Sequence, residues 1–413
     1  GMSGAQPKAG NISGCITVCA EVNIKAIQTR LKQNWVDEII DNVDELCVRV
    51  KKAQKENKVV SIAYHGNIVT VWEAFLDNDI YVDIGSDQTS LHNPWSGGYY
   101  PDDITFEEAN KLIHKNPSLF KKKVQKTLIR HVELINAHSK KGTYFFDYGN
   151  AFLLEASRAK ANVINKGGSF KYPSYVQDIM GPMCFDYGFG PFRWVCASGD
   201  QNDLDKSDEI ACNVLKKLSE NATDDVKQQM LDNIKWIEAA KENNMVVGSK
   251  ARILYADSEG RIEIAKAFNK AINDKIIGPI ILGRDHHDVS GTDSPYRETS
   301  NIYDGSQFTA DMAIHNIIGD SFRGATWVSI HNGGGVGWGE VINGGFGMLI
   351  DGSDMSNMNI ESMLFWDVNN GIARRNWARN PGAITQIKRA MRKNKMLTVT
   401  LPNLVNDNLL KDL

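Results

Sequence analysis

Eight of the fifteen residues from 333 to 347 are glycine, and this feature restricts most strongly how the chain can fold. Glycine at this density weakens helices and strands, so a fold tolerates it where the backbone passes close to something, usually a phosphate or a flat ring. A loose surface loop is the alternative, and it fits poorly because apolar residues are interleaved among the glycines. These are Val336, Trp338, Val341, Ile342 and Phe346. We therefore predict an ordered segment that contacts a ligand.

A short polar cluster precedes the glycine-rich segment. Asp285, His286, His287 and Asp288 follow the apolar run Ile280–Leu282, which we expect to be a strand. Carboxylates and imidazoles at the carboxyl end of a strand suit general acid–base catalysis. They could also bind a metal, but no further ligand follows at a fixed spacing, so we predict no metal site. The histidines can alternatively serve as structural hydrogen-bond partners.

The first hundred residues alternate between strand and helix patterns. We expect strands at Cys15–Ala20, Val59–Tyr64 and Ile80–Ile84, with a long helical region at Ile27–Lys55 and a helix at Val69–Leu76. This order predicts an α/β fold with a doubly wound, Rossmann-like parallel sheet. Ligands bind such sheets at the carboxyl ends of the strands, and polar residues occupy those ends here.

The start of the chain carries a weak signal for dinucleotide binding. Gly1 and Gly4 precede an expected helix, and Glu21 follows at a strand end. A helix N-terminus suits a pyrophosphate, and an acid at this spacing suits the adenosine ribose. The signal is weak by itself because the full G-x-G-x-x-G pattern is absent. We also expect the first strand of the nucleotide-binding sheet to be missing.

The rest of the chain continues the alternation of helices and strands and indicates a second unit beyond about residue 150. Helices are expected within Ile104–His138 and within 203–245, and residues 150–195 look irregular. Further strands are expected at Tyr144–Tyr148, Ala251–Tyr255, Ile280–Leu282 and Ala325–Ile330. We place the boundary near residue 150. This gives a Rossmann-like domain with the weak dinucleotide-binding signal at 1–150 and a second α/β core domain at 151–413.

Two further places are candidates for ligand contact. We expect Arg193 in a loop of rigid and apolar residues, where it can be a fixed guanidinium fork for a carboxylate, or equally a surface charge or the partner of a nearby acid. A second group follows the third expected strand, where polar neighbours favour contact with a nucleotide, although its aromatic members can be core. Its members are Gln88, His92, Tyr99 and Tyr100.

Bulk composition excludes several classes of function. The net charge is −3, which gives no sign of binding to nucleic acid or to an anionic membrane. No apolar run is long enough to cross a bilayer, and the first residues do not resemble a signal peptide. The six cysteines are scattered without a paired spacing, which is typical of a reduced, cytoplasmic protein.

Long motifs make the chain resemble a known family. They are GMSGAQPKA, SDQTSLHNP-x3-GYYP, FDYGNAFLLEA, GFGPFRWVCASGD, GRDHHDVSGTDSPYRETSNIYDGS and GATWVSIHNGGGVGWGEVINGGFG. These motifs are similar to those of urocanate hydratase (urocanase). The resemblance runs from the first residue to the last, and the C-terminal NNGIARRNWARN and LTVTLPNLV look closest to the animal-type branch.

The resemblance implies an activity and a cofactor. Urocanases are lyases (hydro-lyases) that bind NAD+ tightly and use it as an electrophile rather than as a redox carrier. They add water to urocanate and give 4-imidazolone-5-propanoate in histidine degradation, a part of histidine metabolism. Members are cytoplasmic homodimers, so urocanate and a second copy of the chain are the implied partners.

The resemblance also assigns roles to residues. Arg193 would hold the urocanate carboxylate, and Asp285 or Asp288 would donate the proton or activate water, without the motif deciding which. Arg297 and Glu298 would fix the site. The residues implied to contact the dinucleotide are Gly1, Met2, Ser3, Glu21, Asn67, Ile68, Gln88, Thr89, Ser90, Leu91, His92, Tyr99, Tyr100, Tyr148 and Gly335.

Two departures from the family pattern limit these expectations. Bacterial members carry a cysteine where this chain has Leu254, so a thiol role is not expected there, and Cys184 and Cys196 are not evident substitutes. The family also has an N-terminal region before the GMSGAQ turn, so this chain can be a fragment, a misassigned start or half of a split enzyme. We expect it to be inactive or nearly so by itself. A non-catalytic NAD-binding fragment and an NAD-dependent dehydrogenase remain the alternatives.

Overall fold

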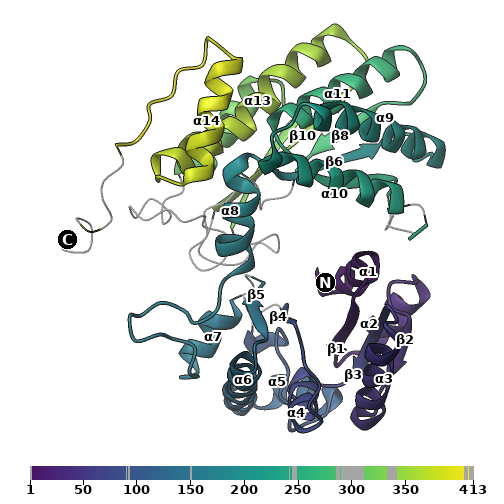
Figure 1. Ribbon diagram of the computed structural model, residues 1–413, viewed down its shortest axis with the longest axis vertical. Coiled ribbons are helices and arrows are strands. Elements are labelled where there is room, and N and C mark those ends of the chain that lie inside the picture. Colours follow the sequence, from purple (N-terminus) through teal and green to yellow (C-terminus); the bar gives the residue numbers. More distant parts are fainter. Residues whose placement is uncertain are drawn as a thin grey trace. The chain divides into compact units, whose positions relative to one another are not determined.

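The computed structural model describes residues 2–89, 91, 94–148, 151–240, 242–243, 249–284, 289, 311–332, 342–403 and 408. The chain divides into two compact units (Figure 1). Unit 1 comprises Gly1–Tyr175 with Glu242–Asn244, and unit 2 comprises Val176–Lys241 with Met245–Leu413. No helix in the described ranges is long and apolar enough to cross a membrane.

A three-stranded parallel sheet forms the centre of the first half of unit 1. Its order is β1 (Ile16–Glu21), β3 (Val60–His65) and β2 (Glu38–Ile40). The central strand β3 is buried except at its last residue, His65, in keeping with its largely apolar sequence. Glu21 lies opposite His65 in the register, so the carboxyl ends of β1 and β3 meet at one edge.

Helices cover both faces of this sheet. The helices α3 (Val43–Glu56) and α4 (Ile68–Asp77) share a core with Ile62 on one face, while α2 (Ile24–Lys32) packs against Ala63 on the other. The short helix α1 (Gln6–Ser13) follows a 3₁₀ turn at Met2–Ala5 and packs on β1. The predicted doubly wound parallel sheet is therefore confirmed.

Two local expectations for unit 1 were wrong. The region Ile27–Lys55 is not one helical stretch, because α2 and α3 are separated by strand β2. The break is stabilised by Asp37, whose carboxylate accepts hydrogen bonds from the backbone nitrogen and the hydroxyl of Ser61, at 2.8 and 2.9 Å. The third of the expected strands, Ile80–Ile84, is also misplaced, because the strand found here, β4, runs from Ile84 to Asp87.

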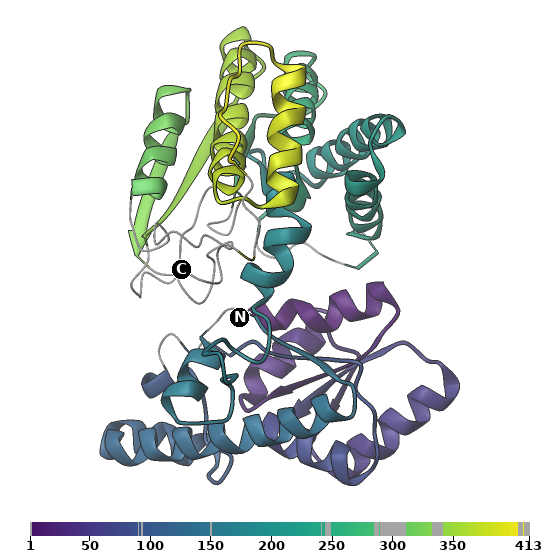
Figure 2. The same cartoon turned by 60° about the vertical axis from the view of Figure 1, so that its left-hand side comes forward.

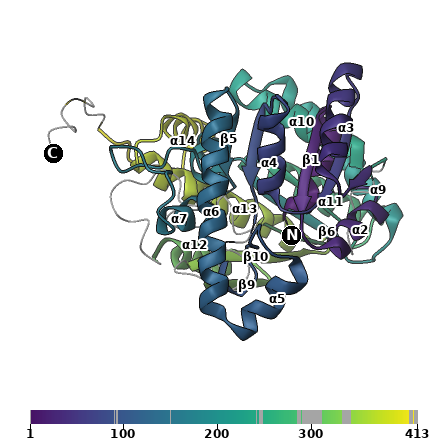
Figure 3. The same ribbon diagram turned by 90° about the horizontal axis from the view of Figure 1, so that it is seen from below.

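The second half of unit 1 is built around a two-stranded parallel sheet of β4 and β5 (Tyr144–Asp147). The helices α5 (Phe106–Lys115), α6 (Pro117–Lys140) and α7 (Phe152–Arg158) surround it, and Figure 3 shows α6 alongside α4. Phe120, Phe145 and Phe152 are core residues here, each at most 2% exposed. A further 3₁₀ turn spans Pro94–Ser96. Residues 151–175 pack into this core, so unit 1 extends beyond the boundary that we placed near residue 150.

Unit 2 contains a five-stranded sheet in the order β7 (Ala251–Ala256), β6 (Gly190–Cys196), β8 (Ile280–Gly283), β10 (Ile342–Ile350) and β9 (Trp327–Asn332). Every neighbouring pair is antiparallel. Strand β6 lies within the stretch that we expected to be irregular. Three short helical segments precede it: Tyr175–Met180, α8 (Gly181–Met183) and Phe185–Tyr187.

Helices pack against one face of this sheet. Phe192 and Trp194 of β6 point to that face and are fully buried. The Trp194 Nε1 atom donates to the Ser207 hydroxyl at 2.9 Å, and its ring lies 5.2 Å from that of Phe268. Figure 2 shows the last two helices side by side. The helices of unit 2 are α9 (Gln201–Glu220), α10 (Asp224–Ala240), α11 (Ser258–Asn273), α12 (Asp311–Phe322), α13 (Asp354–Trp377) and α14 (Pro381–Lys393).

The end of the glycine-rich segment is a strand. Gly344 and Gly347 belong to β10, where a Cβ atom would overlap the side chain of Ile317 at the first position and the ring of Trp327 at the second. Close packing of α12 and of Trp327 therefore accounts for these two glycines. Residues 333–341 lie outside the described part of the chain, so the expectation of ligand contact there stays a prediction.

Candidate cofactor and substrate sites

The carboxyl edge of the parallel sheet in unit 1 brings several predicted residues together. Glu21 ends β1, and its Oε1 atom accepts a hydrogen bond from the backbone nitrogen of Asn23 at 2.8 Å. The nitrogen of Gly66, just past β3, donates to the Glu21 carbonyl at 3.1 Å. A Cβ at Gly66 would lie 2.5 Å from the Tyr64 ring, so glycine lets the chain turn tightly here.

Asn67 connects this edge to the loop around residue 100. Its Oδ1 atom accepts from the nitrogen of Val69 at 3.0 Å and caps α4, which begins at Ile68. Its Nδ2 atom donates to the Tyr100 carbonyl at 3.0 Å. Burial, and secondarily the charge of Glu21, raise the pKa of Tyr100, so its hydroxyl stays protonated and donates to Asn110 at 2.9 Å.

Two of the predicted cofactor residues have core side chains. Tyr99 is 2% exposed, and its hydroxyl is 2.9 Å from Nδ1 of His131. Burial lowers the pKa of His131 to about 3, so the imidazole is neutral. Leu91 is 1% exposed. Any contact between these two residues and a ligand therefore has to use the backbone, in agreement with the alternative that the aromatics here are core.

Gln88, Thr89 and Tyr148 lie at the carboxyl ends of β4 and β5. The Gln88 Nε2 atom donates to the Ser86 hydroxyl at 3.2 Å. Both the backbone nitrogen and the hydroxyl of Thr89 donate to Oδ1 of Asp87. The ring of Tyr148 stacks on Tyr175, with centroids 4.9 Å apart. All three follow strands of the two-stranded sheet, and their contact with a cofactor stays a prediction.

Sequence reasoning missed a pair of buried carboxylates at this edge. Asp87 and Asp147 lie opposite each other in the register of β4 and β5, and they are 4% and 2% exposed. Burial raises the pKa of Asp87 to about 7, and the charge of Asp147 contributes in the same direction. The Asp147 carboxylate accepts from the Leu153 nitrogen at 3.2 Å. The signal in the sequence that could have revealed this pair is the aspartate at the end of each of the two strands.

The helix α1 has features that suit an anion. Its N-cap residue, Ala5, makes no side-chain capping bond to the first turn. A Cβ on Gly10 would overlap the Thr17 hydroxyl, so this glycine allows α1 to lie close against β1. Close helix–strand packing by glycine is one of the roles that glycines have in dinucleotide-binding folds. Met2 and Ser3 form the preceding 3₁₀ turn, and Gly1, Ser90 and His92 lie outside the described residues.

In unit 2, Arg193 lies on the sheet face opposite to the packed helices. It is exposed, while its neighbours Phe192 and Trp194 are fully buried and hold the strand in place. Its cross-strand partners are Ile253 and Gly283. Gly283 has no side chain to fill the cross-strand position beside Arg193, which suits a ligand carboxylate.

The same cross-strand row continues beyond Gly283. Gly347 lies opposite Gly283, and Trp327 lies opposite Gly347. Trp327 is 49% exposed, and its ring lies over Gly347. Across the four strands the order is therefore Arg193, two glycines and Trp327, with the charged and the aromatic side chain at the two ends of the row. The sequence alone did not predict this arrangement.

The predicted acid–base residues are not described by the structure. Asp285, Asp288, Arg297, Glu298 and Gly335 all lie in the undescribed ranges. The residues on either side of the first two are described, however. Arg284 and Val289 are both buried, and side chains of α13 bind each of them. Arg284 and Asp367 were not predicted as site residues.

The cysteines of unit 2 agree with the absence of a thiol role. Leu254, at the position of the bacterial cysteine, is 3% exposed and lies opposite Phe192 in the sheet. Burial raises the pKa of Cys184 to about 12 and that of Cys196 to about 11, so neither is a thiolate near neutral pH. Within the described ranges, no cluster of three or more His, Cys, Asp or Glu side chains could hold a metal ion.

A cavity of about 620 Å³ lies elsewhere in unit 2, between α11, α13 and α14. None of the predicted site residues lines it. Its charged side chains form ion pairs with one another, such as Arg389 with Glu259 at 3.0 Å. The cavity therefore gives no indication of which ligand it would accept.

The fold and the edge residues define an α/β protein that pairs a Rossmann-like unit with a second unit built on an antiparallel sheet. Residues 1–179 match the family model of the urocanase Rossmann-like domain, and residues 182–389 match that of the urocanase C-terminal domain. The chain belongs to the urocanase family.

Curated relatives agree with this assignment. The chain is 56% identical over 420 residues to a probable urocanate hydratase of Dictyostelium discoideum, with all of the chain covered. It is 54% identical to urocanate hydratase of Mus musculus and 53% identical to that of Homo sapiens, each with 98% of the chain covered. In each case the chain spans 62% of the length of the relative.

Proposed function

We propose that this chain is the cofactor- and substrate-binding part of a urocanate hydratase. Such an enzyme adds water to urocanate without net redox change and gives 4-imidazolone-5-propanoate in histidine degradation. The observation that carries the proposal is the meeting of Glu21 and Asn67 at the carboxyl edge of the three-stranded parallel sheet, with Gln88 directly after β4 of the separate two-stranded parallel sheet. Ligands bind such sheets at this edge. Identity above 50% to urocanate hydratases supports the assignment.

The residues at this edge fit NAD+. The first turn of α1, which Ala5 leaves without a side-chain cap, would bind the pyrophosphate, and Glu21 would accept from a ribose hydroxyl. Asn67, Gln88 and Thr89 would orient the rest of the molecule. Bound NAD+ would supply an electrophilic nicotinamide ring.

Arg193 would orient urocanate by binding its carboxylate. A guanidinium fork on a rigid strand restricts the approach of a planar acid more strongly than a flexible lysine would. Asp285 or Asp288 would hold or transfer the proton, with Arg297 and Glu298 beside them. We also propose that the protein is cytoplasmic and forms a homodimer. For the domain boundary, the sequence-based proposal is near residue 150, whereas the structure divides the chain after Tyr175.

Binding of NAD+ to the 413-residue chain tests the proposal. We expect acid extraction of the purified chain to release a nicotinamide cofactor, or added NAD+ to raise the melting temperature. Glu21→Ala should reduce that shift, whereas Glu108→Ala, which changes an exposed acid of α5 in the same unit, should not. A chain that neither contains nor binds NAD+ would refute the proposal. A dehydrogenase would instead leave a lasting change in nicotinamide absorbance on turnover.

A further inference from the structure

We propose that Trp327 is a specificity-determining residue of the substrate site, and that its indole ring stacks on the flat ring of a small acid whose carboxylate binds Arg193. The identity of that acid rests on the proposed function. The arrangement itself, which we call the ring platform, consists of described residues of the sheet in unit 2. They are Arg193 of β6, Gly283 of β8, Gly347 of β10 and Trp327 of β9.

The four residues of the ring platform lie on one face of the sheet. Residues directly opposite each other in an antiparallel pair point to the same face, and each neighbouring pair of this row is opposite in the register. Arg193 is exposed while its neighbour Trp194 is buried, so the row lies on the face opposite to the packed helices. Gly344, three positions before Gly347, faces Ile317 of α12, as alternation along the strand requires.

The indole ring of Trp327 forms one end of the ring platform. A Cβ on Gly347 would overlap the Cε2, Cζ2 and Cη2 atoms of the ring, which belong to its six-membered half. The ring therefore reaches inward from the edge strand β9 across β10. Trp327 is nevertheless 49% exposed, so the part of the ring that β10 does not cover is open to a ligand. Indole rings favour stacking on other flat rings.

Gly283 forms the open floor between the indole and Arg193. Among the described residues, the atom that would lie within 4 Å of a Cβ on Gly283 is the carbonyl oxygen of Phe346, at 3.3 Å. A packed side chain therefore accounts for Gly347 but not for Gly283. A glycine inside a strand often marks a place where a ligand comes close to the backbone, and the floor at Gly283 fits that description.

The ring platform has room for one small ring. Neighbouring strands lie about 4.8 Å apart, so about 10 Å separates the Cα atoms of Arg193 and Gly347, with Gly283 midway. The next row on the same face consists of three apolar residues, Val195, Ile281 and Leu349. A guanidinium group at one end, an indole at the other and an apolar row alongside suit a heteroaromatic ring with a short carboxylate arm.

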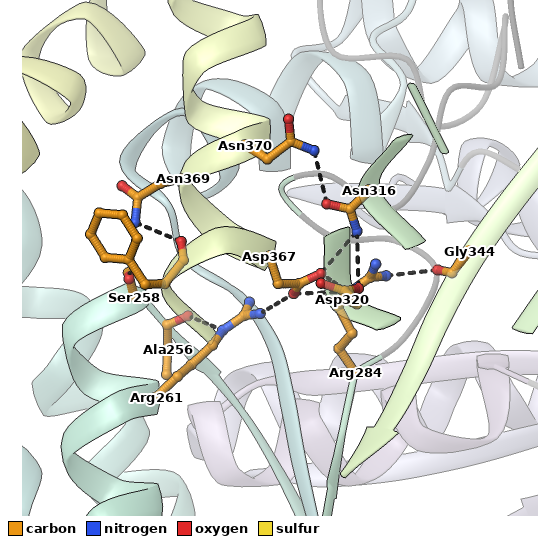
Figure 4. Close-up of polar contacts among 11 residues, drawn as sticks. Ala256, Ser258, Arg261, Arg284, Asn316, Asp320, Gly344, Asp367, Asn369 and Asn370 are labelled. Atoms are coloured by element: carbon orange, nitrogen blue, oxygen red, sulfur yellow. Dashed lines mark hydrogen bonds and ion pairs between the residues drawn. The ribbon is translucent and has the colours of Figure 1, made fainter. Parts of the chain in front are cut away.

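Buried polar bonds support the floor from the helix side. Arg284 follows Gly283, and its Nε atom lies 3.0 Å from both carboxylate oxygens of Asp367 in α13 (Figure 4). Its Nη1 atom donates to the Gly344 carbonyl of β10 at 2.8 Å, and Asn316 of α12 donates to Asp367 at 2.9 Å. Strands β8 and β10 are thus joined beneath the floor, and a rigid floor holds a stacked ring in one orientation.

A structural role is the alternative for Trp327. Aromatic rings that cover glycines stabilise the edges of sheets, and β9 is an edge strand. In that case, loss of the ring would lower the melting temperature and would affect all ligands of unit 2 alike. Stacking instead predicts that the loss depends on whether the ligand has a flat ring.

Binding of two acids of matched size to the 413-residue chain, in the presence of NAD+, separates the two roles. Imidazolepropionate has a flat ring, and 3-cyclopentylpropanoate has a puckered, saturated ring. Trp327→Leu should weaken imidazolepropionate binding roughly three- to tenfold, the value of one stacked contact, and 3-cyclopentylpropanoate binding less than about twofold, because leucine keeps an apolar contact. Trp377→Leu, which removes an indole that is 51% exposed on α13, is the matched control and should change neither affinity.

Arg193→Ala should weaken binding of both acids, since both have the carboxylate. Gly283→Ala is a second variant, for the case that Trp327→Leu does not fold, and its methyl group on the floor should weaken imidazolepropionate binding roughly fivefold or more. Equal weakening of the two acids in Trp327→Leu, unchanged affinity in Gly283→Ala, or no binding of imidazolepropionate by the unmodified chain would overturn the ring platform. Ring-selective binding by a completed protein that leaves urocanate unchanged would keep the ring platform and refute the proposed function.

Discussion

At the scale of single residues, the chemistry of the proposed reaction depends on a few side chains with unusual surroundings. Arg193 is an exposed guanidinium on a rigid strand beside a glycine, and Asp87 is a buried acid whose pKa is raised to about 7. The first residue suits recognition of a carboxylate. The second makes the stability of unit 1 sensitive to pH.

Replacing Arg193 tests recognition of the substrate. Arg193→Ala should weaken binding of imidazolepropionate by roughly 2–4 kcal/mol, the value of a charge-assisted, bidentate contact in a desolvated site. NAD+ affinity should stay the same, as it should in Arg323→Ala, the control at a second arginine of unit 2. Calorimetric titration of both ligands measures the two effects. Equal loss of both ligands would mean that Arg193 is structural.

The two undescribed aspartates need a test by turnover. Asp285→Asn and Asp288→Asn remove a proton donor while they keep the size of the side chain. The variant at the catalytic position should lose roughly a hundredfold or more in turnover with ligand binding retained, as expected for loss of a positioned acid or base. Steady-state kinetics with a binding titration separates the two positions. Normal turnover in both variants would remove this motif from the mechanism.

Asp87 predicts a specific pH dependence of stability. Its pKa is about 7 when folded and near 3.8 when unfolded, so the folded state holds a proton that the unfolded state releases above about pH 4. The free energy of unfolding therefore falls as the pH rises from about 4 to about 7. The loss is at most about 4 kcal/mol, because each unit of difference between the two pKa values corresponds to about 1.36 kcal/mol. Asp87→Asn, which still accepts from Thr89, should remove this loss. Urea unfolding at pH 5 and pH 8 measures it, and identical pH dependence in both proteins would be contrary to this account.

At the scale of elements, the sequence predicted β1, β3, α4 and β5 because strands and helices with strong apolar patterns are decided locally. Strand β2 was missed since three residues between two helices carry too short a pattern. Strand β10 was missed because its glycines look like a loop until Ile317 and Trp327 are seen to pack on them. The bond from Arg284 to Asp367 joins residues 83 positions apart, which no local pattern can reveal.

The packing of α1 on β1 can be tested at Gly10. Gly10→Ala should destabilise unit 1 by about 1–3 kcal/mol, since the new methyl group overlaps the Thr17 hydroxyl, and should weaken NAD+ binding by displacing the helix. Adding Thr17→Ala should restore much of both losses by removing that hydroxyl. Denaturant unfolding and NAD+ titration measure the pair. If the double variant were no better than Gly10→Ala alone, close packing would not be the reason for the glycine.

At the scale of the whole molecule, the chain combines a parallel sheet with a dinucleotide-type edge in unit 1 and an antiparallel sheet with a candidate carboxylate site in unit 2. It spans 62% of the length of its urocanate hydratase relatives, so the activity of the complete protein is a proposal. The strand pattern placed Glu21 and Asn67 at strand ends from sequence alone, whereas Arg193 was expected in a loop and lies on strand β6. The bond of the buried Arg284 to Asp367 of α13 required the structure.

The most direct measurement is urocanate turnover. The chain is assayed with NAD+, alone and together with the remaining part of a relative's sequence, while urocanate absorbance and the redox state of nicotinamide are followed. The account predicts that the completed protein consumes urocanate without accumulating NADH, and that Arg193→Ala sharply reduces this consumption at low urocanate concentration. A completed protein that leaves urocanate unchanged, or that forms NADH in step with its consumption, would contradict the account.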